Sequence, residues 1–88
     1  MALHYEILKY NDIDKYANHI LTDDMPFVLS FRTFSVVSSR NVQNTNTVYD
    51  VIVFNRDDHL LESFSFDTYD AYLQWLKDEY RKREDKTQ

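Results

Sequence analysis

The chain has 88 residues, of which 43% are hydrophobic and 28% charged, and its formal net charge is −5. This size fits one domain that buries roughly 60–65% of its unfolded surface, and the hydrophobic content excludes a disordered chain. The chain contains no cysteine and no glycine, which excludes disulfides, thiolate metal sites and the glycine-dependent loops that bind phosphates or present a nucleophile.

The N-terminal segment lacks the basic stretch and apolar core of a signal peptide, and no apolar run reaches the roughly 20 residues of a membrane helix. We therefore expect a protein of the host-cell cytoplasm that does not bind a membrane. Residues 2–10 fit a short strand as well as one face of a helix, because Leu3, Tyr5 and Ile7 alternate while Leu3, Ile7 and Leu8 share a helical face. We favour an extended segment.

Residues 11–23 predict an amphipathic helix. Asn11 is a suitable N-cap, and acids follow it in the first turn, where the helix dipole favours them. Apolar residues then recur at helical spacing, and Asp23, Asp24 and Pro26 end the helix. The apolar stripe consists of Ile13, Tyr16, Ala17, Ile20 and Leu21.

Residues 27–37 predict a strand in which the apolar residues change face between Phe31 and Phe34. A β-bulge near Arg32 and Thr33 would return both sets to one face. Residues 38–46 are polar and without periodicity, so we expect a surface loop that is either functional or disordered.

Residues 47–66 predict two strands joined by an Asn- and Asp-rich turn at residues 55–58. Both faces of the first strand are apolar, as in a central strand covered on two sides. The second strand alternates more cleanly, and its serine face is expected to meet water. The two faces of the first strand are Tyr49, Val51 and Val53 against Val48, Ile52 and Phe54; those of the second are Leu60, Phe64 and Phe66 against Leu61, Ser63 and Ser65.

Residues 67–86 predict a second helix, capped by Asp67, and residues 81–88 read as a charged, frayed C-terminal tail. The whole chain, residues 1–88, then forms a single α+β domain: helix, three-stranded antiparallel meander, helix, with room for an extra N-terminal strand. If both helices pack on one face, the open face implies a partner or a homodimer. The core stripe of the second helix is Tyr69, Tyr72, Leu73, Leu76 and Tyr80.

Catalytic and metal chemistry find little support in the sequence. The chain has three histidines, no cysteine nucleophile and no serine in an activating motif. Its adjacent carboxylates lie in predicted loops rather than in the facing geometry of acid–base catalysis. Asp57, Asp58 and His59 supply too few ligands for a metal site. We expect a protein that is not an enzyme and needs no cofactor or metal.

A protein-binding role is the best interpretation. Residues 1–80 hold 6 Lys and Arg against 13 Asp and Glu, so the body is more acidic than the total and suits a basic partner, for example a nucleic-acid-binding protein. Trp75, with Tyr72 and Glu79, forms an aromatic edge that suits a binding anchor, although Trp75 also fits the rim of the core. The predicted partner-binding acids are Asp23, Asp24, Asp50, Asp57, Asp58 and Glu62.

In size, acidity and element order the chain is similar to small phage-encoded inhibitors such as some anti-CRISPR proteins, and to small acidic antitoxin or immunity proteins. This resemblance implies a non-enzymatic inhibitor or accessory protein of a phage or mobile element. A homodimeric structural or assembly protein is the first alternative. A nucleic-acid-binding regulator that uses Arg40 and the basic run at residues 81–86 is the second, although the acidic body opposes direct nucleic-acid binding.

Overall fold

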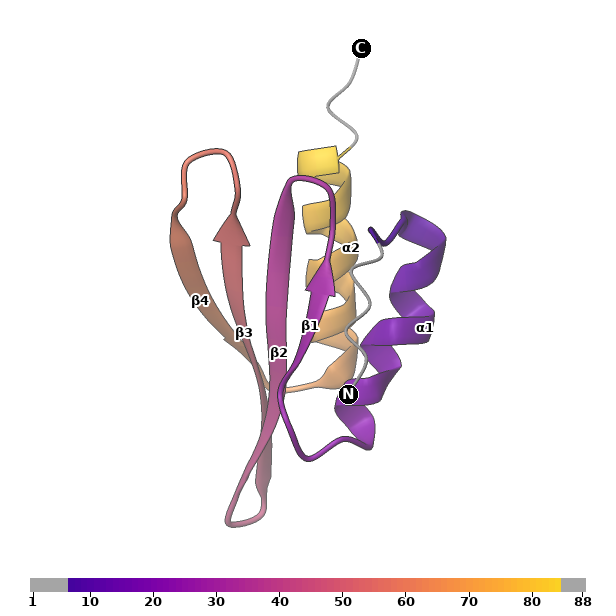
Figure 1. The fold of residues 1–88 in the computed structure, drawn as a ribbon. Helices are drawn as coiled ribbons and strands as arrows, with labels where there is room; N and C mark the ends of the chain where they lie inside the picture. Colours follow the sequence, from indigo (N-terminus) through magenta and orange to yellow (C-terminus); the bar gives the residue numbers. More distant parts are fainter. Residues whose placement is uncertain (1–6, 85–88) are drawn as a thin grey trace.

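The computed structural model describes residues 7–84, which form a helical N-terminal segment, four strands and a C-terminal helix (Figure 1). The helical segment is a short α-helix between two 3₁₀ turns. The elements are η1 (Tyr10–Asp12), α1 (Ile13–Ala17), η2 (Asn18–Leu21), β1 (Phe27–Ser30), β2 (Phe34–Gln43), β3 (Asn46–Asn55), β4 (Leu61–Phe66) and α2 (Tyr69–Glu84).

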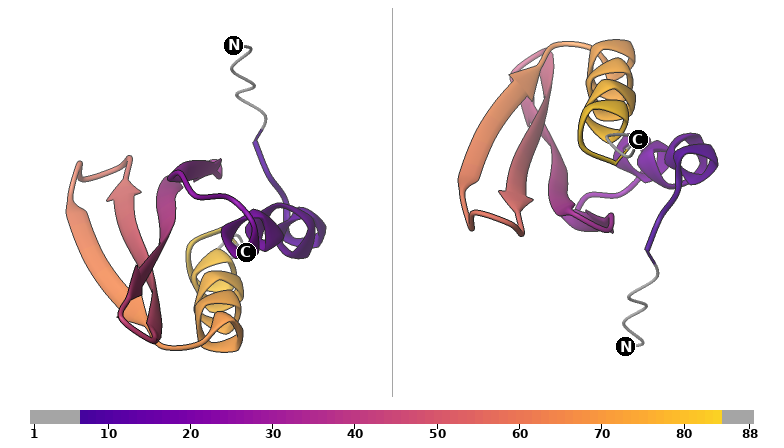
Figure 2. Two further views of the ribbon diagram at one scale, coloured as in Figure 1. Left: turned by 90° about the horizontal axis from the view of Figure 1, so that it is seen from below. Right: turned by 90° about the horizontal axis from the view of Figure 1, so that it is seen from above.

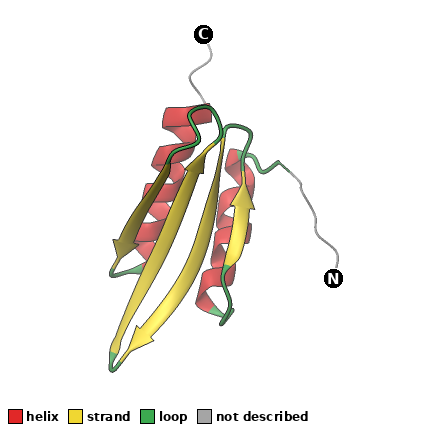
Figure 3. Ribbon diagram, turned by 60° about the vertical axis from the view of Figure 1, so that its left-hand side comes forward, coloured by secondary structure: helices red, strands yellow, loops and turns green. Residues whose placement is uncertain are grey.

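The four strands form one antiparallel sheet in the order β1-β2-β3-β4. Both α1 and α2 lie on the same face of this sheet, which gives a two-layer arrangement (Figure 2). The opposite face is covered by no element among the described residues (Figure 3). The predicted α+β class is therefore confirmed, whereas the sheet has four strands rather than the predicted three.

The prediction of one bulged strand at residues 27–37 is wrong, because the chain reverses at Arg32 and Thr33. The Phe31 N–H donates to the Phe34 carbonyl at 2.8 Å, and this bond closes a hairpin between β1 and β2. Residues that face each other across a hairpin point to the same side of the sheet. The rings of Phe31 and Phe34 accordingly stack with centroids 4.7 Å apart, and both are fully buried. The change of face in the sequence thus marks a turn.

The prediction of a polar loop at residues 38–46 is also wrong. Residues 38–43 continue β2, and a tight turn at Asn44 and Thr45 leads into β3. Asn44 adopts φ 57°, a left-handed conformation that asparagine tolerates better than most residues. The far end of this hairpin extends beyond the helices (Figure 1), so both of its faces are exposed and no apolar alternation is needed.

The N-terminal helix begins one residue earlier than predicted and lacks the expected cap. Lys9 rather than Asn11 occupies the N-cap position, and its N–H donates to the Asp12 carboxylate at 3.0 Å. Residues 7–9 have no regular secondary structure, although Lys9 is extended, and the Leu8 N–H donates to the Ser30 carbonyl at 2.9 Å. Among residues 7–9 there is no strand, and residues 2–6 of the predicted extended segment lie outside the described residues.

Helix α2 begins after Thr68, whose hydroxyl accepts a hydrogen bond from the Ala71 N–H at 3.1 Å. The predicted cap, Asp67, is one residue too early. The helix continues to Glu84, within the predicted range of residues 67–86, so residues 81–84 are helical and not frayed; residues 85–88 lie outside the described residues. The predicted core stripe of α2 packs on the sheet as expected.

The core lies between the helices and the inner face of the sheet. Val51 and Val53 of β3 are 1% exposed and point to the helices, as their predicted face requires. Tyr72 of α2 is fully buried among aromatic neighbours, and its hydroxyl donates to the buried Ser38 Oγ at 2.8 Å. The main buried residues are Leu8, Ile13, Ala17, Ile20, Leu29, Phe31, Phe34, Val36, Val51, Val53, Tyr72 and Leu76.

Candidate interaction surface

The face of the sheet that the helices leave open carries few charged groups: Asp50 on β3, and the guanidinium of Arg56, which donates to the hydroxyl of the outward-pointing Ser35 at 2.6 Å. Asp50 is the only charged residue among the outward-pointing positions of the four described strands. Charged residues make up 28% of the chain, so this face is depleted of charge relative to the whole. The other outward positions are Val28, Ser30, Ser35, Val37, Ser39, Asn41, Gln43, Asn46, Val48, Ile52, Phe54, Leu61, Ser63 and Ser65.

Apolar side chains gather in the half of the open face that is closer to the β3–β4 turn. The register aligns Val28, Val37 and Ile52 in one row across three strands. The next row places Phe54 beside Leu61. Val28 is 58% exposed, Ile52 is 44% exposed and Leu61 is 67% exposed, so these aliphatic side chains are accessible to solvent. We call these two rows the apolar half of the open face.

The remaining part of the open face is polar apart from Val48, and Asp50 is its only charged residue within the described strands. The Asp50 carboxylate accepts a hydrogen bond from the Ser65 hydroxyl at 2.6 Å and another from the Asn41 amide. Both donors are neutral neighbours on the adjacent strands. The carboxylate is therefore fixed in the plane of the sheet surface by cross-strand bonds.

The predicted aromatic anchor lies on the other face, at the rim of the core. The Trp75 ring is half-buried, with its centroid 5.5 Å from those of both Phe64 and Phe66 on β4. Tyr72 is fully buried, and Glu79 is 7% exposed with salt bridges to cations of its own helix. Of this predicted trio, only Trp75 presents some surface to a partner.

The predicted acidic residues lie in separate regions of the molecule. Asp23 and Asp24 follow η2 at one end, where Asp24 pairs with Arg40 at 3.0 Å. Asp57 and Asp58 are exposed in the β3–β4 turn at the opposite end (Figure 1). Glu62 points to the helix-covered face, with a carboxylate oxygen 3.7 Å from the guanidinium of Arg83. These residues and Asp50 do not form one continuous acidic surface.

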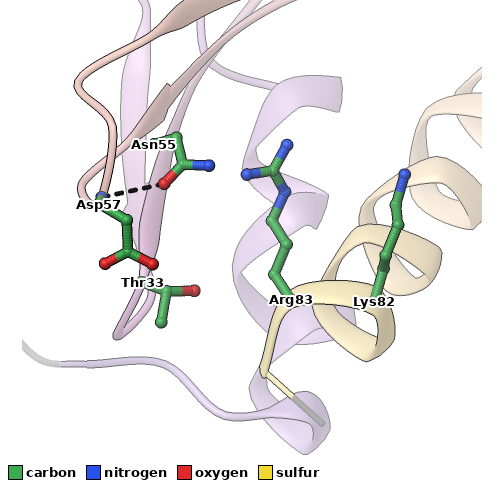
Figure 4. A pocket seen from close by; sticks show the side chains of 5 residues that line it. All are labelled: Thr33, Asn55, Asp57, Lys82 and Arg83. Atoms are coloured by element: carbon green, nitrogen blue, oxygen red, sulfur yellow. Dashed lines mark hydrogen bonds between the residues drawn. The ribbon is translucent and has the colours of Figure 1, made fainter. Parts of the chain in front are cut away.

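A polar pocket of about 280 Å³ lies between the β3–β4 turn and the end of α2 (Figure 4). Its two cations are already paired: Lys82 with Glu79 at 3.1 Å, and Arg83 with Glu79 at 2.8 Å. Since the cationic groups have partners within the chain, the pocket does not indicate an anionic ligand. Its lining residues are Thr33, Asn55, Asp57, Lys82 and Arg83.

Glu84 fastens the end of α2 to the β1–β2 turn, a role that the interpretation of residues 81–88 as a frayed tail missed. One carboxylate oxygen accepts hydrogen bonds from both the N–H (2.8 Å) and the hydroxyl of Thr33. The other oxygen lies 3.7 Å from Nε of Arg32. The spacing of four residues from Tyr80 places Glu84 on the buried side of the helix, and this signal was available in the sequence.

Replacing Glu84 by alanine is expected to lower the free energy of unfolding by about 2 kcal/mol, because hydrogen bonds to a charged group are worth roughly 1.5–3 kcal/mol each and water replaces part of them. Urea denaturation of the variant measures this loss. Glu84→Gln keeps an acceptor for Thr33 and should lose about half as much. A loss below about 0.5 kcal/mol in Glu84→Ala would show that the contact is not a significant tether.

Comparison of the chain with protein-family models, curated proteins and solved structures found no match. Within residues 7–84, no helix is both long and apolar enough to cross a membrane. The same residues contain no group of three or more His, Asp or Glu side chains that could hold a metal ion. Any statement of function therefore depends on the surface geometry described above.

Proposed function

We propose that the protein is a non-enzymatic protein-binding module that docks through the open face of its sheet. The supporting observation is the combination of exposed aliphatic side chains with only two charged groups on that face, the Asp50 carboxylate and the Arg56 guanidinium. The core of a protein–protein interface is likewise depleted of charged residues. An antiparallel sheet whose outer face is meant for water usually alternates apolar and polar residues more strictly.

Binding through this face would be driven mainly by apolar burial. Covering a fully exposed valine, leucine or isoleucine side chain contributes about 1.5–3 kcal/mol. Val28, Ile52 and Leu61 are each exposed by two fifths or more, so together they supply several kcal/mol towards the cost of association. A module of this kind acts as an inhibitor or accessory protein by occupying a surface of its partner.

Docking of the acidic residues on a basic partner is the competing mechanism, and the exposed Asp57 and Asp58 favour it. The dependence of binding on salt concentration distinguishes apolar docking from docking of the acidic residues. At 1 M salt the Debye length is about 3 Å, so contacts between exposed charges are screened. Apolar docking through the open face should persist at that salt concentration, whereas acid-driven docking should weaken strongly.

The test is affinity capture from host lysate with the wild-type chain and two variants that each add one negative charge to the open face. Ile52→Glu lies in the centre of the apolar half and should abolish capture. Gln43→Glu lies on the same face at the far end of the β2–β3 hairpin and should leave capture intact. Trp75→Ala tests the helix edge in the same assay. Capture that survives Ile52→Glu but is lost at 1 M salt would refute docking through the open face.

A further inference from the structure

We infer that the open face binds a second copy of this chain, so that two sheets pack face to face in a homodimer. This inference rests on the proposed function and names its partner. The resulting assembly has four layers, helices–sheet–sheet–helices, in which the charge-poor faces lie inside and the charged helices remain outside. Two-layer packing around an apolar interior is the general solution for a sheet with one uncovered apolar face.

The lack of an excess charge on the face favours a second copy over a strongly charged partner. The chain has a net charge of −5, so two copies repel each other wherever their acidic surfaces approach. The open face is the surface on which this repulsion is smallest, because Asp50 is its only acidic residue among the described strands and the guanidinium of Arg56, hydrogen-bonded to the outward-pointing Ser35, offsets it. A strongly basic or strongly acidic partner, in contrast, finds no excess of either charge there.

The position of Asp50 selects the symmetry of the dimer. A two-fold axis parallel to the strands would bring the two Asp50 carboxylates together across an interface about 10 Å thick. If the two-fold axis instead runs perpendicular to the strands, between the rows of Ile52 and Phe54, the apolar half of one copy packs against the apolar half of the other. The two Asp50 residues then lie about 20 Å apart along the strands, at about 3.4 Å per residue, which exceeds the Debye length of about 8 Å at physiological salt.

The size of the overlap predicts a reversible dimer. Four strands at roughly 4.8 Å span about 19 Å, and the overlap along them is about 20 Å. A corrugated patch of these dimensions buries on the order of 1,000 Å² over the two copies, close to the lower limit for a specific interface. The dimer should therefore form over a micromolar concentration range rather than persist on dilution.

Sedimentation equilibrium of the purified chain from about 1 to about 200 μM tests the dimer. The mass should rise from 10.7 kDa towards twice that value. Ile52→Glu and Leu61→Glu should each weaken association at least tenfold, and Leu61 is 67% exposed, so its replacement leaves the fold intact. Gln43→Glu adds the same charge to the same face outside the overlap and should dimerise like the wild type.

Spin labels on a Gln43→Cys variant test the axis, since the chain has no other cysteine. An axis across the strands places the two labelled positions about 48 Å apart, whereas an axis along the strands brings them within about 20 Å. The shorter distance would overturn the proposed symmetry.

A monomer at every concentration, or a dimer that survives Ile52→Glu, would overturn the homodimer. If the wild type stays monomeric and Ile52→Glu still abolishes capture of another protein from lysate, the homodimer is refuted and the proposed function is supported. If the dimer forms as described while capture of another protein survives Ile52→Glu, the open face serves self-association and the capture uses another surface.

Discussion

Replacing Tyr72 by alanine is expected to destabilise the domain by about 3–5 kcal/mol, the cost typical of removing a large aromatic side chain from a core. Tyr72 is fully buried, packs near Tyr49, Phe66 and Tyr69, and bonds Ser38 on the central strand β2. A domain of this size is stabilised by only about 0.05–0.15 kcal/mol per residue. The alanine variant should therefore lose at least about 12 °C in Tm, at about 4–8 °C per kcal/mol.

Two conservative variants separate packing from hydrogen bonding at this position. Tyr72→Phe keeps the ring and leaves the Ser38 hydroxyl buried without its partner, at a cost of about 1–2 kcal/mol. Ser38→Ala should cost a similar amount, because it leaves the buried Tyr72 hydroxyl without an acceptor. The double variant should cost less than the sum of the two, since removing both partners leaves no unsatisfied group. Additive losses, measured by thermal or urea unfolding, would show that the hydroxyls are not coupled.

The sequence predicts the helices and the faces of β3 better than it predicts β2. Apolar spacing identified both helices, because a buried stripe at period 3.6 is imposed by packing on the sheet. The second half of β2 lies beyond the helices, with both faces in water, so its residues carry no alternation. Its strand conformation comes instead from the backbone ladder with β3, to which the turn at Asn44 and Thr45 joins it. Propensity and pattern do not reveal such pairing.

The β1–β2 turn illustrates a different limit. The switch of apolar face between Phe31 and Phe34 is visible in the sequence, but a bulge and a reversal both explain it. A two-residue hairpin turn usually contains glycine or asparagine, and Arg32 and Thr33 are neither, so the local sequence does not indicate the reversal. The structure favours the reversal because it brings both phenylalanine rings into one buried stack. Burial of two large rings outweighs an unfavourable local turn.

The interaction surface depends on these same boundaries. An open face was expected only if both helices packed on one side of the sheet, and its residues could be assigned only once β1 and β2 were separated and the register was known. Residues 38–43, read as a loop, supply three of its outward positions: Ser39, Asn41 and Gln43. The near absence of charge on this face is a property of four strands together and appears in no single segment of the sequence.

Alkaline pH should destabilise the protein through Tyr72. Burial raises the pKa of this tyrosine from 10.0 to about 12, against a smaller opposing contribution from its hydrogen bond to Ser38. The unfolded chain therefore loses this proton at lower pH than the native protein. The stabilisation is fully present below pH 10 and is lost as the pH rises to about 12. The loss amounts to roughly 3 kcal/mol at most.

Urea denaturation between pH 9 and 12 measures this loss, with tyrosinate absorbance as an independent probe of ionisation. In Tyr72→Phe most of the decline in stability over this range should disappear, together with the tyrosine that titrates near pH 12. A smaller decline should remain from Tyr69, because burial and the nearby Asp14 raise its pKa as well. If the free energy of unfolding fell equally with pH in the wild type and in Tyr72→Phe, the Tyr72 hydroxyl would be accessible to water in the native protein. The Tyr72–Ser38 hydrogen bond would then not be buried in the core.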